Sequence, residues 1–323
     1  MRAILRLAYL SPLLLLDACG GRVDGEDDAA PSRVAPQDLP ACPGRVTAPA
    51  DRAPTDAKLF AAGSDLTAVG FDDTTIYFAS ANESEGWPLR AIPKAGGTPR
   101  VLGRASAYQL VVDEENVLVG TGGGVWAHPK AGGEGKGIAP LFSFAVDGEF
   151  IYGTNVEPGN VSRRNKDGKE ETILAVGHGS QGVSVYDGYV YWANYPDNTV
   201  ARVRTTGGPA EPVGTFPTFT RGAVADCHYV YVSVGNYGDQ VYRVPVKGGP
   251  PELLVDVGGS LALDTMSLYV QNRSQTVRVS LQTGKVTSLG EGHGRTGGLP
   301  QSIVVDSDAV YWVTARGLMR ATK

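Results

Sequence analysis

The chain has 323 residues, 20% of them charged, and a formal net charge of -5. Its hydrophobic content of 42% is enough to bury a large core, which excludes global disorder. A mildly acidic chain without a Lys/Arg cluster also lacks the electrostatic footprint of a nucleic-acid-binding protein.

The first segment, residues 1–18, is typical of a secretory signal peptide. Arg2 and Arg6 give it a short basic start, and residues 7–16 form an apolar run. That run is shorter than the roughly 20 residues that a membrane-spanning helix needs. The sequence therefore predicts an exported protein.

Residues 16–19 read Leu-Asp-Ala-Cys and resemble the lipobox of bacterial lipoproteins. The resemblance implies cleavage before Cys19, acylation of this cysteine and a lipid anchor in the cell envelope. Asp17 stands where the family has a small residue, so an ordinary signal peptide with cleavage nearby is the alternative. Gly20 follows in place of the Asp that is associated with inner-membrane retention, which favours the outer membrane.

A flexible tether is predicted over residues 19–56, which are rich in Pro, Asp and Ala and have no apolar periodicity. A coil of this length spans on the order of 30–35 Å. Cys42 lies in this tether and Cys227 in a predicted turn. An oxidising compartment would allow these two cysteines to pair, and two unpaired thiols are the alternative.

Residues 57–323 are predicted to form one domain, in which one pattern recurs from Leu66 onward. An apolar run ends in Asp, a turn follows, a second apolar run usually carries Tyr, and two further short strands are joined by a Gly-rich turn. By subtraction, successive marker aspartates stand 34 to 42 residues apart; they are Asp72, Asp113, Asp147, Asp187, Asp226, Asp264 and Asp306. Periods near 40 residues with four strands each predict β-propeller blades.

Seven markers predict an all-β, seven-bladed propeller with four-stranded blades. The last unit, around Met319, lacks a fourth strand, whereas residues 57–61 resemble the fourth strands of the other units. We therefore expect the N-terminal strand at Leu59 and Phe60 to complete the last blade, which leaves few exposed sheet edges.

Two units carry a Tyr-Trp pair, Tyr191-Trp192 and Tyr311-Trp312. With the repeated turns, these units resemble YWTD, NHL and TolB-like propellers of bacterial envelopes and receptors. The resemblance implies binding of proteins or small ligands, and it predicts architecture better than function.

The candidate binding face consists of the loops between second and third strands, together with the connections between blades, because both emerge at the same end of the ring. Aromatic side chains mixed with amides suit recognition, although Asn also favours turns. The candidate residues are Asn82, Trp87, Asn155, Asn194, Tyr195, Asn236, Tyr237, Asn272 and Arg273.

Catalytic motifs are weak. The marker aspartates are best interpreted as turn residues that bond nearby backbone amides. Streptogramin lyases are seven-bladed propellers that use His and Glu around a metal, and His178, Glu291 and His293 would be the matching residues here. We therefore predict a binding or protein-interaction module without catalytic residues, metal or cofactor, and a propeller lyase or hydrolase is the alternative.

The expected partner is a protein, peptide or glycan, with no nucleic acid and with membrane contact through the lipid anchor only. The propeller itself is expected to be a monomeric domain.

Overall fold

The computed structural model describes residues 42–48, 51–155, 159–176, 180–236, 239–294 and 301–323. These residues form 28 strands and one short 3-10 helix, η1 (Glu83–Glu85). In this described part of the chain, no helix is long and apolar enough to cross a membrane.

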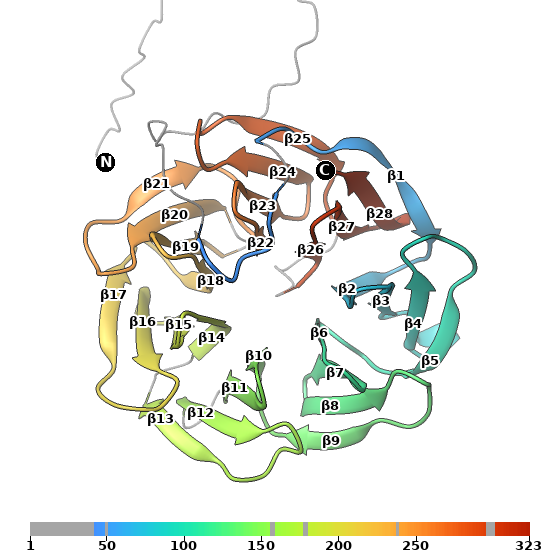
Figure 1. The fold of residues 1–323 in the computed structure, drawn as a ribbon, viewed down its shortest axis with the longest axis horizontal. Coiled ribbons are helices and arrows are strands. Elements are labelled where there is room, and N and C mark those ends of the chain that lie inside the picture. The colour runs from blue at the N-terminus through green and yellow to red at the C-terminus, as the bar shows by residue number, and fades with distance from the viewer. Residues whose placement is uncertain (1–41, 49–50, 156–158, 177–179, 237–238, 295–300) are drawn as a thin grey trace, which may run out of the picture.

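The strands form seven four-stranded antiparallel sheets arranged as blades around an axis (Figure 1). Blade 1 contains β2 (Leu66–Phe71), β3 (Thr75–Ser80), β4 (Pro88–Pro93) and β5 (Arg100–Arg104). Blade 2 contains β6 (Gln109–Val112), β7 (Asn116–Thr121), β8 (Gly124–Pro129) and β9 (Lys136–Ala139). Blade 3 contains β10 (Ser143–Asp147), β11 (Phe150–Thr154), β12 (Asn160–Asn165) and β13 (Thr172–Val176).

Blade 4 contains β14 (Ser180–Tyr186), β15 (Tyr189–Asn194), β16 (Thr199–Arg204) and β17 (Glu211–Thr215). Blade 5 contains β18 (Thr220–Ala225), β19 (Tyr229–Val234), β20 (Gln240–Pro245) and β21 (Glu252–Val255). Blade 6 contains β22 (Ser260–Leu263), β23 (Ser267–Gln271), β24 (Gln275–Ser280) and β25 (Val286–Glu291). Blade 7 contains β26 (Ile303–Val305), β27 (Ala309–Thr314), β28 (Gly317–Thr322) and, from the other end of the chain, β1 (Thr55–Ala62).

The predicted closure of the ring by the N-terminal strand is confirmed. β1 pairs antiparallel with β28, with Leu59 opposite Met319 and Lys58 opposite Arg320. Figure 1 shows the blue β1 beside the red β28 on the perimeter. The all-β, seven-bladed architecture predicted from the repeat is therefore the observed one.

Five of the seven marker aspartates cap the turn between the first and second strands of their blade. In Asp72, Oδ1 accepts hydrogen bonds from the backbone N–H groups of Thr74 and Thr75, at 3.0 and 2.9 Å. Asp113, Asp226, Asp264 and Asp306 make the equivalent bonds. Local Asp-to-amide bonding of this kind fixes the turn.

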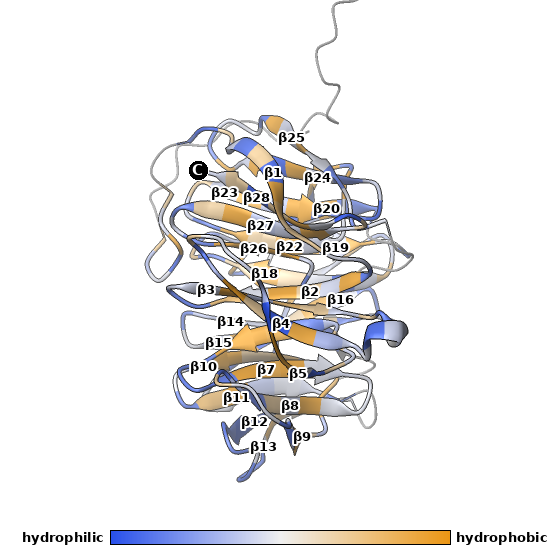
Figure 2. Ribbon diagram, turned by 90° about the vertical axis from the view of Figure 1, so that its right-hand side faces the viewer, coloured by the Kyte–Doolittle hydropathy of each residue, from blue (hydrophilic) through white to orange (hydrophobic). Residues whose placement is uncertain are grey.

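The sheets pack face to face through apolar side chains. Trp192 and Trp312, the tryptophans of the two Tyr-Trp units, are 1% and 0% exposed. Figure 2 shows the blades from the side, with hydrophobic colour concentrated along the strands. Because inner strands contact a neighbouring sheet on both faces, they do not alternate between apolar and polar residues.

The two ends of the ring differ. We call the end with the marker aspartates the turn face, and the end with the second-to-third-strand loops and the connections between blades the loop face. Each innermost strand begins at the loop face and ends at the turn face.

Residues 42–48 and 51–54, which we call the strap, lie against the turn face. Cys42 forms a disulfide with Cys227, in the turn after β18. Farther along, the Val46 carbonyl accepts a hydrogen bond from the N–H of Thr265 at 3.0 Å, in the turn after β22. Asp51 pairs with Arg278 of β24. The described end of the segment expected as a flexible tether, 19–56, therefore contacts blades 5 and 6.

Candidate functional site

The central channel opens at the loop face into a cavity of about 380 Å³. This volume lies in the range of small-molecule sites. Most of the lining comes from the beginning of the innermost strands of blades 2 to 6 and from the residues just before them, and Ser233 near the end of β19 adds to it. Among the first set are Tyr108, Gln109, Phe142, Ser143, Gln181, Gly182, Arg221, Gly222, Gly259 and Ser260.

Two β-bulges shape one wall of the cavity. In β18 the pairing with β19 shifts between Thr220 and Gly222, so that Arg221 is the extra residue. In β14 the pairing with β15 shifts in the same way at Gly182. Bulges bend a strand and re-aim the side chain that they carry, and they are frequent beside functional sites.

The two bulges touch each other. Gly182 has a φ of +53°, and a Cβ at this position would lie 2.5 Å from Gly222 Cα and 2.7 Å from the Arg221 carbonyl oxygen. Only glycine combines this backbone conformation with so close an approach. The wall between blades 4 and 5 is therefore backbone packed directly on backbone.

Arg221 is held at the channel mouth by neighbours from two blades. Its Nε donates to the Gly235 carbonyl at 3.3 Å, and its Nη2 donates to the Asn236 carbonyl. The guanidinium also lies 4.9 Å from the centre of the Tyr195 ring, and that ring stacks on Phe219 at 4.8 Å. These contacts fix a positive charge beside the cavity.

Neutral polar side chains bridge the innermost strands. Ser143 Oγ accepts a hydrogen bond from the Val183 N–H at 3.0 Å. The Gln109 amide bonds both backbone groups of Phe144, with Nε2 donating at 2.5 Å and Oε1 accepting at 3.3 Å. These side chains satisfy strand edges that would otherwise face the channel unpaired.

Gln301, just before β26, bonds to two innermost strands of other blades. Its carbonyl accepts from the Val69 N–H in blade 1, and its side-chain Oε1 accepts from the Leu110 N–H in blade 2 at 3.2 Å. It thereby links blade 7 to both of these blades.

Tyr108 is the lining side chain with a titratable hydroxyl, and burial raises its pKa to about 12. The hydroxyl lies 2.8 Å from the Thr121 carbonyl and 2.7 Å from the Phe142 carbonyl, and it donates to them. The group therefore stays protonated at neutral pH and is unsuited to act as a base or nucleophile.

Three predicted asparagines use their side chains in local turns. The Asn82 amide donates to Glu85 and its Oδ1 accepts from Ser84. Asn194 and Asn272 likewise bond neighbouring side chains or backbone amides. These bonds position the second-to-third-strand loops.

Two other predicted residues, Tyr195 and Asn236, meet at Arg221, one through its ring and the other through its carbonyl. Tyr237 lies outside the described residues. Trp87 is 41% exposed on the loop between β3 and β4, and Arg273 is exposed on the loop between β23 and β24. Asn155 follows β11, and its buried Oδ1 has no partner among the described residues.

The residues of the alternative lyase or hydrolase prediction do not form a described cluster. Glu291 ends β25, an outermost strand, and pairs with Arg316 at 3.1 Å. His293 is buried, and its backbone N–H donates to the Asn272 carbonyl at 3.0 Å. His178 lies outside the described residues.

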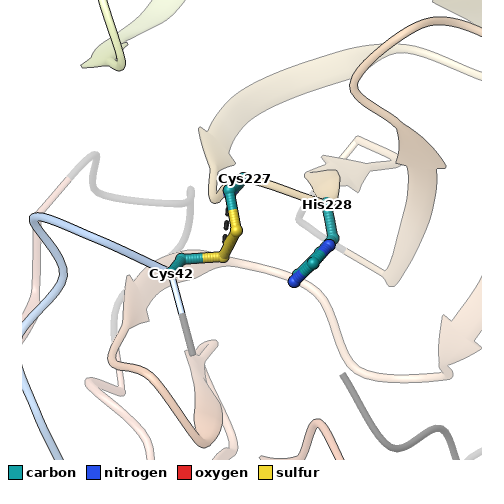
Figure 3. Close-up of side chains that lie close together, drawn as sticks. All are labelled: Cys42, Cys227 and His228. Carbon is teal, nitrogen blue, oxygen red and sulfur yellow. Dashed lines mark hydrogen bonds between the residues drawn. A yellow bond between two sulfur atoms is a disulfide. The ribbon is translucent and has the colours of Figure 1, made fainter. Parts of the chain in front are cut away.

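One group of potential metal ligands occurs among the described residues, namely Cys42, Cys227 and His228 (Figure 3). Their ligand atoms lie within 4.8 Å of one another. Both sulfurs belong to the disulfide, and the thiolate is the form of cysteine that binds a metal. In this oxidised state the group joins the strap to blade 5 and lacks thiolate ligands.

Comparison with known proteins supports the fold. No protein-family model and no curated protein matches the sequence. Virginiamycin B lyase from Staphylococcus aureus has a similar structure, with a TM-score of 0.61, 11% identity and coverage of 83% of this chain and 98% of that chain. The WD40 propeller domain of Doa1 has a TM-score of 0.59 and 12% identity, with coverage of 84% of this chain and 96% of that chain. BamB from Moraxella catarrhalis has a TM-score of 0.53 and 15% identity, with coverage of 79% of this chain and 84% of that chain. At these identities the likeness shows the propeller fold alone.

Sequence reasoning missed the cavity lining. A signal was present, because the residue four positions before the marker Asp is polar in four units: Gln109, Ser143, Ser260 and Ser302. The first three of these line the cavity. In β2, β14 and β18 a bulge shifts this column by one residue. Arg221 therefore stands five positions before its marker Asp, not four, and counting back from the Asp does not find it.

Proposed function

We propose that this protein is a lipid-anchored, non-catalytic binding module of a bacterial cell envelope that engages its partner through the loop face. The predicted signal peptide and the acylation site at Cys19 supply the export and the anchor. The partner classes that suit this face are a protein, a peptide or a glycan.

The observation that carries the proposal is the placement of the strap. Cys42 is bonded to the turn after β18, so the chain before it joins the propeller at the turn face. The cavity is lined by residues at the start of the innermost strands and opens at the loop face. An anchor attached through the strap would therefore leave the loop face directed away from the membrane.

The chemistry of the cavity favours binding over catalysis. Its lining contains no Asp, Glu, His, Lys or Cys among the described residues, and Tyr108 is held protonated. General acid–base and nucleophilic mechanisms need such groups with a pKa near the working pH.

Acylation is tested by labelling the protein in cells with an alkyne-bearing fatty acid. The Cys19→Ser variant should lose the label and leave the membrane fraction. Cys227→Ser, which removes a cysteine outside the lipobox, should keep both. Equal labelling of wild type and Cys19→Ser would refute the anchor.

The face is tested by placing a photo-cross-linking amino acid at single exposed positions in cells. Trp87 and Arg273 report on the loop face, and Asp73 and Lys169 are exposed controls on the turn face. The proposal expects one discrete adduct from the loop-face positions and none from the controls. Adducts from both faces alike, or from neither, would contradict it.

A further inference from the structure

We infer that the channel mouth is a binding site for a small organic monoanion, such as a carboxylate attached to an apolar ring, with Arg221 as its charge partner. The inference rests on the proposed function in one respect, which is that the loop face is the binding face. It adds the chemical class of a ligand that this face holds beside or in place of a macromolecular partner.

The formal charge of the cavity lining is positive only. Arg221 is the one formally charged residue among the described residues of the lining. A planar guanidinium carries five N–H donors, and two of its nitrogens donate to the carbonyls of Gly235 and Asn236. No carboxylate among the described residues pairs with this guanidinium. Its remaining donors and its charge therefore favour a carboxylate ligand, which matches the guanidinium fork.

Further donors surround the cavity. The hydroxyls of Ser143 and Ser233 each accept a backbone N–H, from Val183 at 3.0 Å and from Gly259 at 2.8 Å. A hydroxyl that accepts in this way still has its own hydrogen to donate. A lining that offers donors and no carboxylate selects an acceptor-rich, anionic ligand.

The apolar part of the ligand has its own wall. Tyr108 and Phe142 pack with ring centres 5.7 Å apart, and Val183 and Leu261 lie on the same lining. Apolar walls with a few placed polar groups are the usual composition of a small-molecule site. A ligand with an anionic end and a flat hydrophobic body fits both halves.

The site is also built rigidly. The bulge that carries Arg221 packs on the bulge at Gly182, and Arg221 itself is fixed by Tyr195 and Asn236. A charge that is held in place before binding requires little reorganisation when the ligand arrives.

The test uses two probes of one shape, 2-naphthoate and 2-naphthamide, with the purified protein at pH 7. Affinities are measured by titration calorimetry and by ligand-observed NMR. Naphthoate should bind about tenfold more tightly than the amide, because naphthoate carries a negative charge that Arg221 attracts and the amide is neutral. That difference should shrink as salt is added.

Two variants separate charge from shape. Arg221→Gln should abolish the preference for naphthoate while weak binding of both probes persists, and Arg221→Lys should restore part of it. Gly222→Leu should abolish binding of both probes, because a Cβ at Gly222 meets no atom within 4 Å and its side chain would fill the cavity. Arg316→Gln makes the same charge change on the same face, outside the lining, and should behave as wild type.

Equal binding of the two probes to the wild type, absence of binding, or an unchanged preference in Arg221→Gln would each overturn the inference. The comparison of probes on the wild type does not depend on the folding of any variant. Cross-linking through Trp87 without a naphthoate preference would overturn this inference and leave the proposed function standing.

Discussion

The ammonium of Lys323 lies 2.7 Å from Asp264 Oδ2, and their side chains are 4% and 0% exposed. Lys323 follows β28 of blade 7, whereas Asp264 is the marker aspartate of blade 6. The same relationship joins Lys94 to Asp306 and Lys130 to Asp72, at 2.7 and 2.8 Å. In each case a lysine after the third strand of one blade reaches back to the marker aspartate of the preceding blade.

Removing the charge at Lys323 should destabilise the fold strongly. Lys323→Met leaves the Asp264 carboxylate buried without its cationic partner, which typically costs about 3–5 kcal/mol. Urea unfolding measures the loss. Lys169→Met is the control, because the Lys169–Asp167 pair is 77% and 51% exposed and such pairs contribute about 0–1 kcal/mol. Equal effects of the two changes would contradict a buried role for Lys323.

The capping role of Asp72 predicts an acid-dependent stability. Burial acts to raise its pKa, but hydrogen bonds from Lys130, Thr74 and Tyr77 lower it from 3.8 to about 2. A lowered pKa in the folded state stabilises the protein above pH ~4, and this contribution is lost as the pH falls toward 2. Asp72→Asn should therefore be less stable than wild type at pH 7.

The difference in melting temperature between Asp72→Asn and wild type should narrow between pH 4 and pH 2. Asp73→Asn, the same change at the exposed neighbouring residue, is the control. A difference for Asp72→Asn that stays constant across this range would show that its carboxylate charge is not what stabilises the turn.

Reduction should release the strap and weaken the domain. The disulfide joins residues 185 positions apart. The chain-entropy model gives about 5 kcal/mol for a loop of this length, and measured values are typically 2–4 kcal/mol. We expect Cys42→Ser to lower the free energy of unfolding by about 2–4 kcal/mol.

Trypsin provides a local measure of strap release. Arg45 packs over the Tyr186 ring at 4.4 Å in the closed strap. Cleavage after Arg45 should be slow in wild type and fast in Cys42→Ser or after reduction. Equal cleavage rates in both states would mean that the disulfide does not hold the strap down.

Gly182→Ala tests the contact between the two bulges. The substitution combines backbone strain at a φ of +53° with a methyl group 2.5 Å from Gly222 Cα. Gly188→Ala is the matched control, because Gly188 has a φ of +72° and no atom within 4 Å of its added Cβ.

The control should cost about 1 kcal/mol, whereas Gly182→Ala should cost at least 1 kcal/mol more, because overpacking forces the backbone to shift. Thermal unfolding of the two variants measures both values. Equal losses of stability in the two variants would indicate that β14 and β18 can move apart to accommodate the methyl group at no cost in free energy.

The sequence predicted the ring because each blade repeats its own local chemistry. The Asp that caps a turn is readable from one unit, and so is the missing strand beside Met319 that β1 supplies. The cavity is not readable in this way, since the bulge at Arg221 is defined only against the pairing of β18 with β19. A single extra residue changes which side chain reaches the channel, and no local propensity records it.

The candidate face shows the same limit. Asn82 and Asn272 were predicted from their loop positions, and the structure shows their amides bonded within those loops. Asn serves turns and recognition equally well, so residue type alone does not separate the two roles. The position of each Asn relative to Arg221 does separate the two roles, and this position is known only from the fold.

The disulfide also decides where mechanical load enters the domain. β1 closes the ring, and on its own a strand that follows a membrane tether would be the first element peeled off when the tether is pulled. Because Cys42 is covalently joined to Cys227, tension on the chain before residue 42 passes into blade 5 and bypasses the strand that closes blade 7. Traction on the chain before residue 42 would thus reach the ring at blade 5, and not at its closing strand, for as long as the two sulfurs stay oxidised.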